Sequence, residues 1–306
     1  METMESTRSR LLVDVGQTGS RVQDARGKRH VFDTGFTPGT PLEDVVRKAI
    51  SAIEQPHADT VVLSLTGLRG MVPALEPFAS ICVELTGCSS VGMCDDGLAW
   101  SVGSLRGGDG VALAVGGGVV AVARRGNRFV HLDGNGSDFG DSGGAFWIGR
   151  KGLRASIRAL EGSGPNTTLA NHFVDRFGPH DHFVRSCVTR EEIHRAALDF
   201  APRVLEAGSA EDAVAAEILR QGAERLGALV SAATLQLGLE RGATQVALGG
   251  GLMRDEGYSA LVVDTIVSEG LDIEVVDPWG DALDGLDLLE REGRTNIMRL
   301  MTWWNA

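Results

Sequence analysis

The sequence lacks the features that mark nucleic-acid-binding and membrane proteins. Its 306 residues include 29 Lys and Arg against 41 Asp and Glu, so its net charge is -12 at pH 7. A chain this acidic repels phosphate backbones. No apolar run approaches the length that spans a bilayer, and the polar residues 1–10 do not resemble a secretory leader. We therefore expect no nucleic-acid partner, no membrane contact and a cytoplasmic location.

Cysteine is also scarce. The chain has four cysteines and no Cys-x-x-Cys pair. Three of them lie in apolar segments, which is typical of buried structural thiols, although an iron–sulfur site is the alternative that would carry chemistry. The four are Cys82, Cys88, Cys94 and Cys187.

What the chain does have is enough apolar sequence for a large core. Hydrophobic residues make up 43%, and a length of 306 residues favours two lobes. Near the start, an apolar run ends in a carboxylate and a glycine, which is typical of a buried strand that enters a loop. The pattern predicts strands at 11–16, 20–24 and 29–33, a helix over 41–55 and a strand at 61–65. The order strand, strand, strand, helix, strand is distinctive.

The same order begins again after residue 110, which indicates an internal structural repeat. Strands are predicted at 111–115, 119–124 and 128–132, with glycine-rich turns between them. Further helices are predicted at 138–160, 191–206, 211–240, 256–268 and 281–292, with strands at 246–248 and 273–276. Glycines in 106–110 predict a hinge. We expect an N-terminal lobe over 1–108 and a C-terminal lobe over 109–306.

The most informative stretch is residues 134–150, GNGSDFGDSGGAFWIGR, where five glycines and two aspartates precede a helix-like run. Backbone with so few side chains can pass close to a polar ligand. The stretch resembles the signature of N-acetylglucosamine kinases and of the related BadF/BadG/BcrA/BcrD-type ATPases, Gly-Trp-Gly-x-x-x-Gly-Asp-Glu-Gly-Ser-x-x-x-Ile. The resemblance implies the α/β fold of the actin/hexokinase/Hsp70 superfamily, in which two ribonuclease-H-like lobes, each a βββαβα core, flank a nucleotide cleft.

Three glycine turns resemble the nucleotide motifs of that superfamily. Residues 14–21 match Asp-x-Gly-x-Thr-x-x-Arg/Lys at every fixed position, and the resemblance implies that this turn binds ATP phosphates while Asp14 anchors Mg²⁺. Residues 116–118 lack the Thr and Ser that relatives carry, so backbone amides must hold the phosphate there. Residues 249–251 resemble the adenosine motif. Taken singly, such turns are also typical of plain hairpins. The implied nucleotide-binding residues are Gly16, Gln17, Thr18, Arg21, Gly116, Gly117, Gly118, Gly249, Gly250 and Gly251.

Two adjacent aspartates stand where the family carries Asn-Asp. The resemblance makes Asp96 the catalytic base, which accepts a proton from the attacking sugar hydroxyl. A near-normal pKa is enough to ionise such a carboxyl at pH 7. Aspartate is also favoured as a helix N-cap, so Asp95 can cap a helix while Asp96 acts as the base.

Sugar contacts are implied in two places, a strand end that resembles Leu-Ser-Leu-Ser-Gly and the glycine-rich stretch. Three positions depart from the family: Asn135 replaces Trp, Ser142 replaces Glu and Gly144 replaces Ser. These departures predict a smaller or more polar pocket. The implied substrate-binding residues are Thr66, Gly67, Asp96, Gly134, Asn135 and Asp141.

The resemblance implies a homodimeric kinase that uses ATP and Mg²⁺ to phosphorylate the 6-hydroxyl of N-acetylglucosamine, glucosamine or a related amino sugar. Two alternatives stay open. One is an ATPase that activates a 2-hydroxyacyl-CoA dehydratase or benzoyl-CoA reductase through a shared iron–sulfur cluster. The other is a non-catalytic sugar or nucleotide sensor, which the departures from the family motifs favour.

Overall fold

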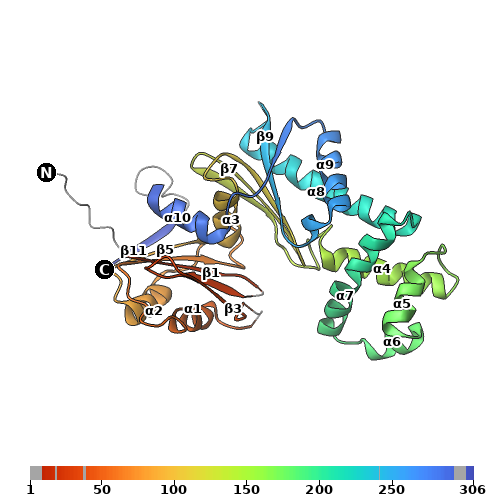
Figure 1. Ribbon diagram of the computed structural model, residues 1–306, viewed down its shortest axis with the longest axis horizontal. Coiled ribbons are helices and arrows are strands. Elements are labelled where there is room, and N and C mark those ends of the chain that lie inside the picture. Colours follow the sequence, from red (N-terminus) through yellow and green to blue (C-terminus); the bar gives the residue numbers. More distant parts are fainter. Residues whose placement is uncertain (1–8, 18, 37–38, 241, 293–300) are drawn as a thin grey trace. The chain divides into compact units, whose positions relative to one another are not determined.

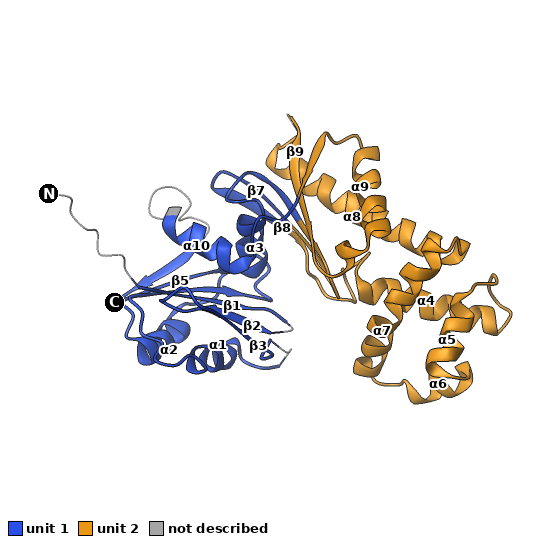
Figure 2. Cartoon of the chain, in the orientation of Figure 1, with its two compact units in different colours: residues 1–112, 122–131, 277–306 blue, residues 113–121, 132–276 orange. Residues whose placement is uncertain are grey.

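A computed structural model describes residues 9–17, 19–36, 39–240, 242–292 and 301–306 (Figure 1). The chain divides into two units (Figure 2). Unit 1 contains residues 1–112, 122–131 and 277–306, and unit 2 contains residues 113–121 and 132–276. This differs from a single division after residue 108, because the C-terminal segment joins unit 1.

Unit 1 is built on a six-stranded sheet of order β11-β5-β4-β1-β2-β3. Strands β1, β4 and β5 run parallel, whereas β2, β3 and β11 are antiparallel to their neighbours. The carboxyl ends of the three parallel strands therefore meet at one end of the sheet. The strands are β1 (Arg10–Val15), β2 (Ser20–Gln23), β3 (Arg29–Phe32), β4 (Thr60–Leu65), β5 (Ser90–Asp95) and β11 (Thr302–Asn305).

Two helix pairs cover opposite faces of this sheet (Figure 1). One pair is α1 (Leu42–Ser51) and α2 (Glu76–Thr86), and the other is α3 (Asp96–Ser104) and α10 (Ala282–Glu292). Leu11 and Val13 of β1 pack in the core with α1 and α2, whereas Leu12 packs with α3 and α10. Because side chains alternate along a strand, Asp14 lies on the same face as Leu12, toward α3.

Two glycines let α10 pack closely on α3. A Cβ atom on Gly103 would overlap the carbonyl oxygen of Asp281, and one on Gly285 would overlap the carbonyl oxygen of Ala99. This contact, together with the pairing of β11 with β5, places the C-terminal segment in unit 1.

The second sheet has five strands in the order β10-β9-β6-β7-β8. Read from β8, this repeats the order of the first sheet from β3 to β5, which confirms the duplicated ribonuclease-H-like core of an actin-like ATPase fold. The strands are β6 (Gly110–Val115), β7 (Val119–Arg125), β8 (Arg128–Asp133), β9 (Thr244–Gly249) and β10 (Ile273–Val276).

The helices of unit 2 differ in part from the prediction. The helix predicted over 138–160 begins at residue 145, because the glycine-rich residues before it form turns in which Asp141 has a φ of 59°. Helices α5 and α6, like α2 of unit 1, were not predicted. The helices are α4 (Ala145–Leu160), α5 (Leu169–Phe177), α6 (His180–Ser186), α7 (Arg190–Ser209), α8 (Ala213–Leu237), α9 (Glu256–Ser268) and the short 3-10 helix η1 (Leu252–Arg254). Within the described ranges, no helix is both long enough and apolar enough to cross a membrane.

Candidate active site

In unit 1, the ends of the parallel strands bring together polar residues that lie far apart in the sequence. Asp14 pairs in register with Ser64 of β4, and Ser64 pairs with Cys94 of β5. Asp95 is the last residue of β5, and Asp96 begins α3. Two motifs that are predicted separately, the first phosphate turn and the aspartate pair, therefore lie at the same end of one sheet.

Asp14 is buried and is hydrogen-bonded to two neighbouring side chains. The Ser64 hydroxyl donates a hydrogen bond of 2.6 Å to Oδ1, and Arg21 donates two, of 2.6 Å and 3.0 Å, to Oδ2. Burial raises the pKa of Asp14, and the charge of Arg21 opposes that rise. Arg21 also lies 3.4 Å from Asp281. Arg21, which the motif predicts to contact the nucleotide, therefore lies beside two carboxylates, Asp14 and Asp281, in this structure.

This arrangement leaves Oδ1 of Asp14 as the oxygen that can accept a hydrogen bond from a water on hydrated magnesium. Oδ2 already accepts two bonds from a guanidinium, whereas Oδ1 accepts one from a neutral hydroxyl. Magnesium keeps several of its waters in proteins and needs few direct protein ligands, so the residues fit a hydrated ion.

The turn after Asp14 is tight. The Gly16 amide donates a 2.9 Å hydrogen bond to the Gly19 carbonyl, and the Phe36 amide donates one to the Gly16 carbonyl. A Cβ atom on Gly35 would overlap the Gln17 carbonyl oxygen, so this turn needs a glycine at position 35. No sequence motif points to that glycine. Thr18, the predicted hydroxyl ligand, lies outside the described residues.

Asp95 caps α3, which confirms the predicted N-cap. Its Oδ1 accepts the amides of Gly97 and Leu98, at 3.0 Å and 3.3 Å. Its Oδ2 accepts the amide of Gly70, at 3.0 Å, from the loop after β4. The carboxylate of Asp95 is therefore committed to holding backbone in place.

Asp96 has fewer partners. One oxygen accepts the Gly97 amide at 2.9 Å, and the Thr66 hydroxyl bonds to the same carboxyl group. Burial raises its pKa from 3.8 to about 7, the negative charges of Asp95 and Asp14 add to the rise, and the two hydrogen bonds oppose it. Asp96 therefore has a raised pKa, not the near-normal one that would suffice for a base. Gly67, the next predicted sugar contact, follows Thr66 with a φ of 80°.

In unit 2, the second glycine turn lies against the start of α4. The Gly116 amide bonds to the Gly118 carbonyl at 2.9 Å. The amides of Ala145 and Phe146, in the first turn of α4, donate to the carbonyls of Gly116 and Gly117 at 2.8 Å and 3.2 Å. The helix start thus fixes the shape of this turn.

Asp141 is bound to the same turn. Its Oδ1 accepts the Val119 amide at 2.8 Å, and a Cβ atom on Gly118 would lie 2.7 Å from that oxygen. The Asp133 carboxylate in turn accepts the amides of Asp141 and Asn135, at 3.0 Å and 3.3 Å. Asp133 is not part of a motif in the sequence, and only the folded backbone identifies its role.

Two further predicted residues lie beside this turn. The Gly134 amide donates to the Val119 carbonyl at 2.9 Å. Gly250, with a φ of 93°, passes so close to Val115 at the end of β6 that a Cβ atom would overlap its carbonyl oxygen. Gly249 ends β9, and Gly251 precedes η1. The second phosphate motif, the sugar signature and the adenosine motif are therefore neighbours within unit 2.

Three of the four cysteines lie in the protein interior, and Cys187 is half-buried. Cys82, Cys88 and Cys94 are buried, as predicted. Burial raises the pKa of the Cys82 thiol to about 12 and that of Cys94 well above its ordinary value. A buried neutral thiol is a poor metal ligand.

Comparisons with known proteins agree with this architecture. The model of the BadF/BadG/BcrA/BcrD ATPase family matches residues 7–281. Sequence comparison with curated proteins finds no match. A proposed N-acetylglucosamine kinase from Chromobacterium violaceum has a similar structure, with a TM-score of 0.68, 20% identity, and coverage of 92% of this chain and 98% of that one.

Two other solved structures share the fold. A proposed N-acetylglucosamine kinase from Porphyromonas gingivalis has a TM-score of 0.64 at 16% identity, with coverage of 93% of this chain and 99% of that one. A ROK family glucokinase from Streptomyces griseus, in complex with glucose and AMPPNP, has a TM-score of 0.52 at 17% identity, with coverage of 92% and 99%.

Proposed function

Because this chain belongs to the BadF/BadG/BcrA/BcrD ATPase family, we propose that it is a kinase that transfers the γ-phosphoryl group of ATP to the 6-hydroxyl of an amino sugar. The observation that carries the proposal is the environment of the Asp96 carboxyl group. A partly buried carboxyl with a pKa of about 7, bonded to a hydroxyl and one amide, suits the proton acceptor for an attacking alcohol.

Asp96 accepts the hydroxyl proton as the sugar oxygen approaches phosphorus. Phosphoryl transfer needs positioning and charge stabilisation more than covalent participation by the protein. The Thr66 hydroxyl and the Gly97 amide orient the carboxylate. Asp95 keeps the first turn of α3 in place through its own amide bonds. Asp96 is thus the proposed proton acceptor, and Asp95 supports the helix turn that carries it.

Backbone turns hold the nucleotide. Each unit carries its own candidate turn, residues 16–18 in unit 1 and residues 116–118 in unit 2, and residues 249–251 of unit 2 are the candidate contact for adenosine. The Gly16 and Gly116 amides bond within their turns, so the other amides of each turn are the proposed phosphate donors. Asp14 would hold a hydrated magnesium ion through Oδ1, and the ion would supply positive charge to balance that of the phosphates. Within unit 2, the bond from Val119 to Asp141 keeps the second turn in its observed shape.

The proposal of an amino sugar as acceptor rests on the resemblance of the glycine-rich stretch to the signature of N-acetylglucosamine kinases. Gly134, Asn135 and Asp141 supply backbone and side-chain groups for hydroxyl recognition, and a site built on hydrogen bonds rejects analogues that lack them. The buried thiols do not favour the alternative of an activator with a cysteine-bound cluster. We also propose that the protein is a homodimer. Light scattering coupled to gel filtration measures the molar mass in solution and tests this.

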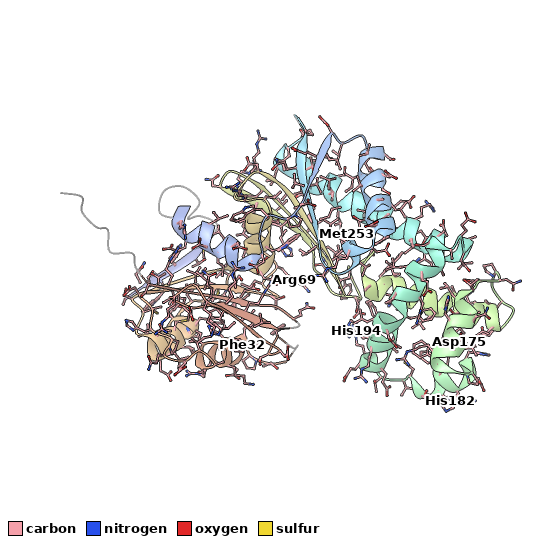
Figure 3. The ribbon with its side chains drawn as sticks, in the orientation of Figure 1. Phe32, Arg69, Asp175, His182, His194 and Met253 are labelled. Atoms are coloured by element: carbon pink, nitrogen blue, oxygen red, sulfur yellow. The ribbon has the colours of Figure 1, made fainter. Side chains whose placement is uncertain are left out.

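The test is sugar-dependent ADP release by the purified protein across hexosamines, acetylated hexosamines and muramic sugars. We expect turnover with at least one of these sugars and a loss of about 10² to 10⁴ in kcat for Asp96→Asn. The matched control is Asp175→Asn, an exposed aspartate on α5 (Figure 3), which retains wild-type turnover. No turnover with any sugar, or full activity in Asp96→Asn, would contradict the proposal.

A further inference from the structure

His131 on β8 lies beside the aspartate pair although no motif includes it. Its side chain is largely buried, and its Nε2 atom is 3.6 Å from Oδ1 of Asp95, within ion-pair range but longer than a hydrogen bond. A Cβ atom on Gly97 would lie 3.5 Å from the imidazole, and one on Gly70 would lie 3.4 Å from the His131 Cβ. His131 therefore packs between the start of α3 and the loop after β4.

These two segments are the ones that Asp95 holds together. Its carboxylate accepts an amide from Gly97 in α3 and another from Gly70 in the loop, where Arg69 precedes it (Figure 3). His131 contacts both segments and faces the carboxylate that joins them. The imidazole thus occupies the place from which a positive charge acts directly on that junction.

The charge balance at this end of the sheet calls for a cation. Asp14 of β1, Asp95 of β5 and Asp96 of α3 bring three carboxyl groups together, and Arg21 of β2 pairs with Asp14. Asp281, before α10, adds a further negative charge near Asp14. Among the described residues, His131 is the basic side chain that lies within ion-pair range of Asp95. Three backbone amides already stabilise the buried carboxylate of Asp95, and a nearby positive charge stabilises it further.

We propose that His131 is a positioning residue for Asp96: it packs against the first turn of α3, which carries the base, and its protonated form balances the charge of Asp95. The inference rests on the proposed role of Asp96. It predicts that His131 acts through Asp95, without contact with the sugar or the nucleotide.

The direct consequence is a set of opposite shifts in the pH profile. Without the imidazolium, the charge of Asp95 acts fully on Asp96, which then holds its proton more tightly. His131→Gln should move the acid limb of kcat/KM to higher pH by roughly half to one pH unit. Asp95→Asn keeps a good N-cap, removes the negative charge and should move the limb to lower pH.

The double variant Asp95→Asn/His131→Gln decides between positioning and a merely structural role. If His131 acts through Asp95, the double variant has the same acid limb as Asp95→Asn alone. A uniform loss of kcat/KM at every pH in His131→Gln, with no movement of the limb, would overturn the proposal. The proposal would also be overturned if His131→Gln moved the acid limb of kcat/KM by the same amount in the Asp95→Asn variant as in the wild type. His182→Gln, an exposed histidine on α6 (Figure 3), is the matched control.

A second readout separates this inference from the proposed function. If no sugar is phosphorylated, the proposed function fails, and the pair is then tested by urea unfolding of the same four proteins. We expect a coupling between Asp95 and His131 at pH 5.5 that disappears at pH 8.5, where an ordinary imidazole is neutral. A coupling of zero at both pH values would overturn the inference.

Discussion

Adjacent aspartates in this chain carry different tasks because their surroundings differ. Asp95 accepts three backbone amides, whereas Asp96 accepts one amide and the Thr66 hydroxyl. The amide bonds commit Asp95 to the helix start, and Asp96 keeps the capacity to exchange a proton. The family resemblance suggested this division of roles, and the structure adds the third amide on Asp95, which comes from Gly70 in the loop after β4.

The pKa of Asp96 predicts the pH dependence of the proposed reaction. A base must be ionised to accept a proton, so kcat/KM should rise with pH through about 7 and level off above it. At pH 6, about a tenth of the carboxyl groups are ionised, and the rate should fall in proportion. Steady-state kinetics from pH 5.5 to 9 measure this limb. A profile that is flat between pH 5.5 and 8 would show that Asp96 titrates elsewhere or is not the base.

The same raised pKa predicts that Asp96 costs stability. The unfolded carboxyl ionises near pH 4 and the folded one near pH 7, so the folded state resists losing its proton. The penalty is absent below pH 4, grows between pH 4 and 7, and is complete above pH 7. The pKa change sets a ceiling of about 4 kcal/mol. Asp96→Asn should therefore stabilise the protein more at pH 8 than at pH 5, as urea unfolding measures. Equal effects at both pH values would rule this linkage out.

The residues of the candidate site divide into those that local sequence reveals and those that it does not. Asp14, Asp96 and the glycine turns stand in short motifs, because a turn needs its glycines next to one another. Gly35, Asp133 and His131 carry no such mark. Each matters through a contact with a residue from another strand or turn, and such contacts exist only after the sheets form.

At the scale of elements, apolar runs predicted most of the strands, because a strand buried on both faces is apolar at every position. Helix α2 was not predicted. Its apolar residues extend around most of the helix, which weakens the helical periodicity of the sequence. The start of α4 was predicted too early because the preceding glycine turns also suit a helix N-terminus. Strand β11 was not predicted, although its tryptophans pack into both cores of unit 1.

The contact between α3 and α10 predicts a sharp difference between two glycines. Gly285→Ala would force a methyl group into the Ala99 carbonyl, so it should destabilise the protein by about 2 kcal/mol or more. Gly257→Ala, in the first turn of α9, meets only ordinary contacts and should be neutral or stabilising by up to about 1 kcal/mol. Thermal and urea unfolding compare them. A destabilisation of similar size in both variants would exclude close helix packing as the cause.

Across the whole molecule, duplication places the two candidate phosphate turns at equivalent positions. The first joins β1 to β2, and the second joins β6 to β7, so each is the first hairpin of its own ribonuclease-H-like core. The proposed base, Asp96, lies in unit 1, whereas the second glycine turn and the adenosine motif lie in unit 2. Substitutions in the turn of unit 2 can therefore test nucleotide binding without altering the proposed base.

Gly116 offers the sharpest test of that separation. A Cβ atom there would meet no protein atom within 4 Å, and its φ is ordinary, so Gly116→Ala should fold like the wild type. The added methyl group would project from the turn that is proposed to hold phosphate. At 100 times its Kd, MgATP should stabilise the wild type by about 2.7 kcal/mol. Gly116→Ala should lose most of that gain and keep the stabilisation by sugar.

Gly242→Ala provides the control, because its Cβ atom would also meet no neighbour within 4 Å and it lies in unit 2, outside every nucleotide motif. It should keep both stabilisations. Asp96→Asn should show the reverse of Gly116→Ala, with MgATP stabilisation retained and the response to sugar reduced, because that carboxyl is proposed to contact the acceptor. If MgATP stabilised Gly116→Ala as much as the wild type, the glycine turn of unit 2 would not hold the phosphates, and nucleotide binding would have to be assigned to other residues.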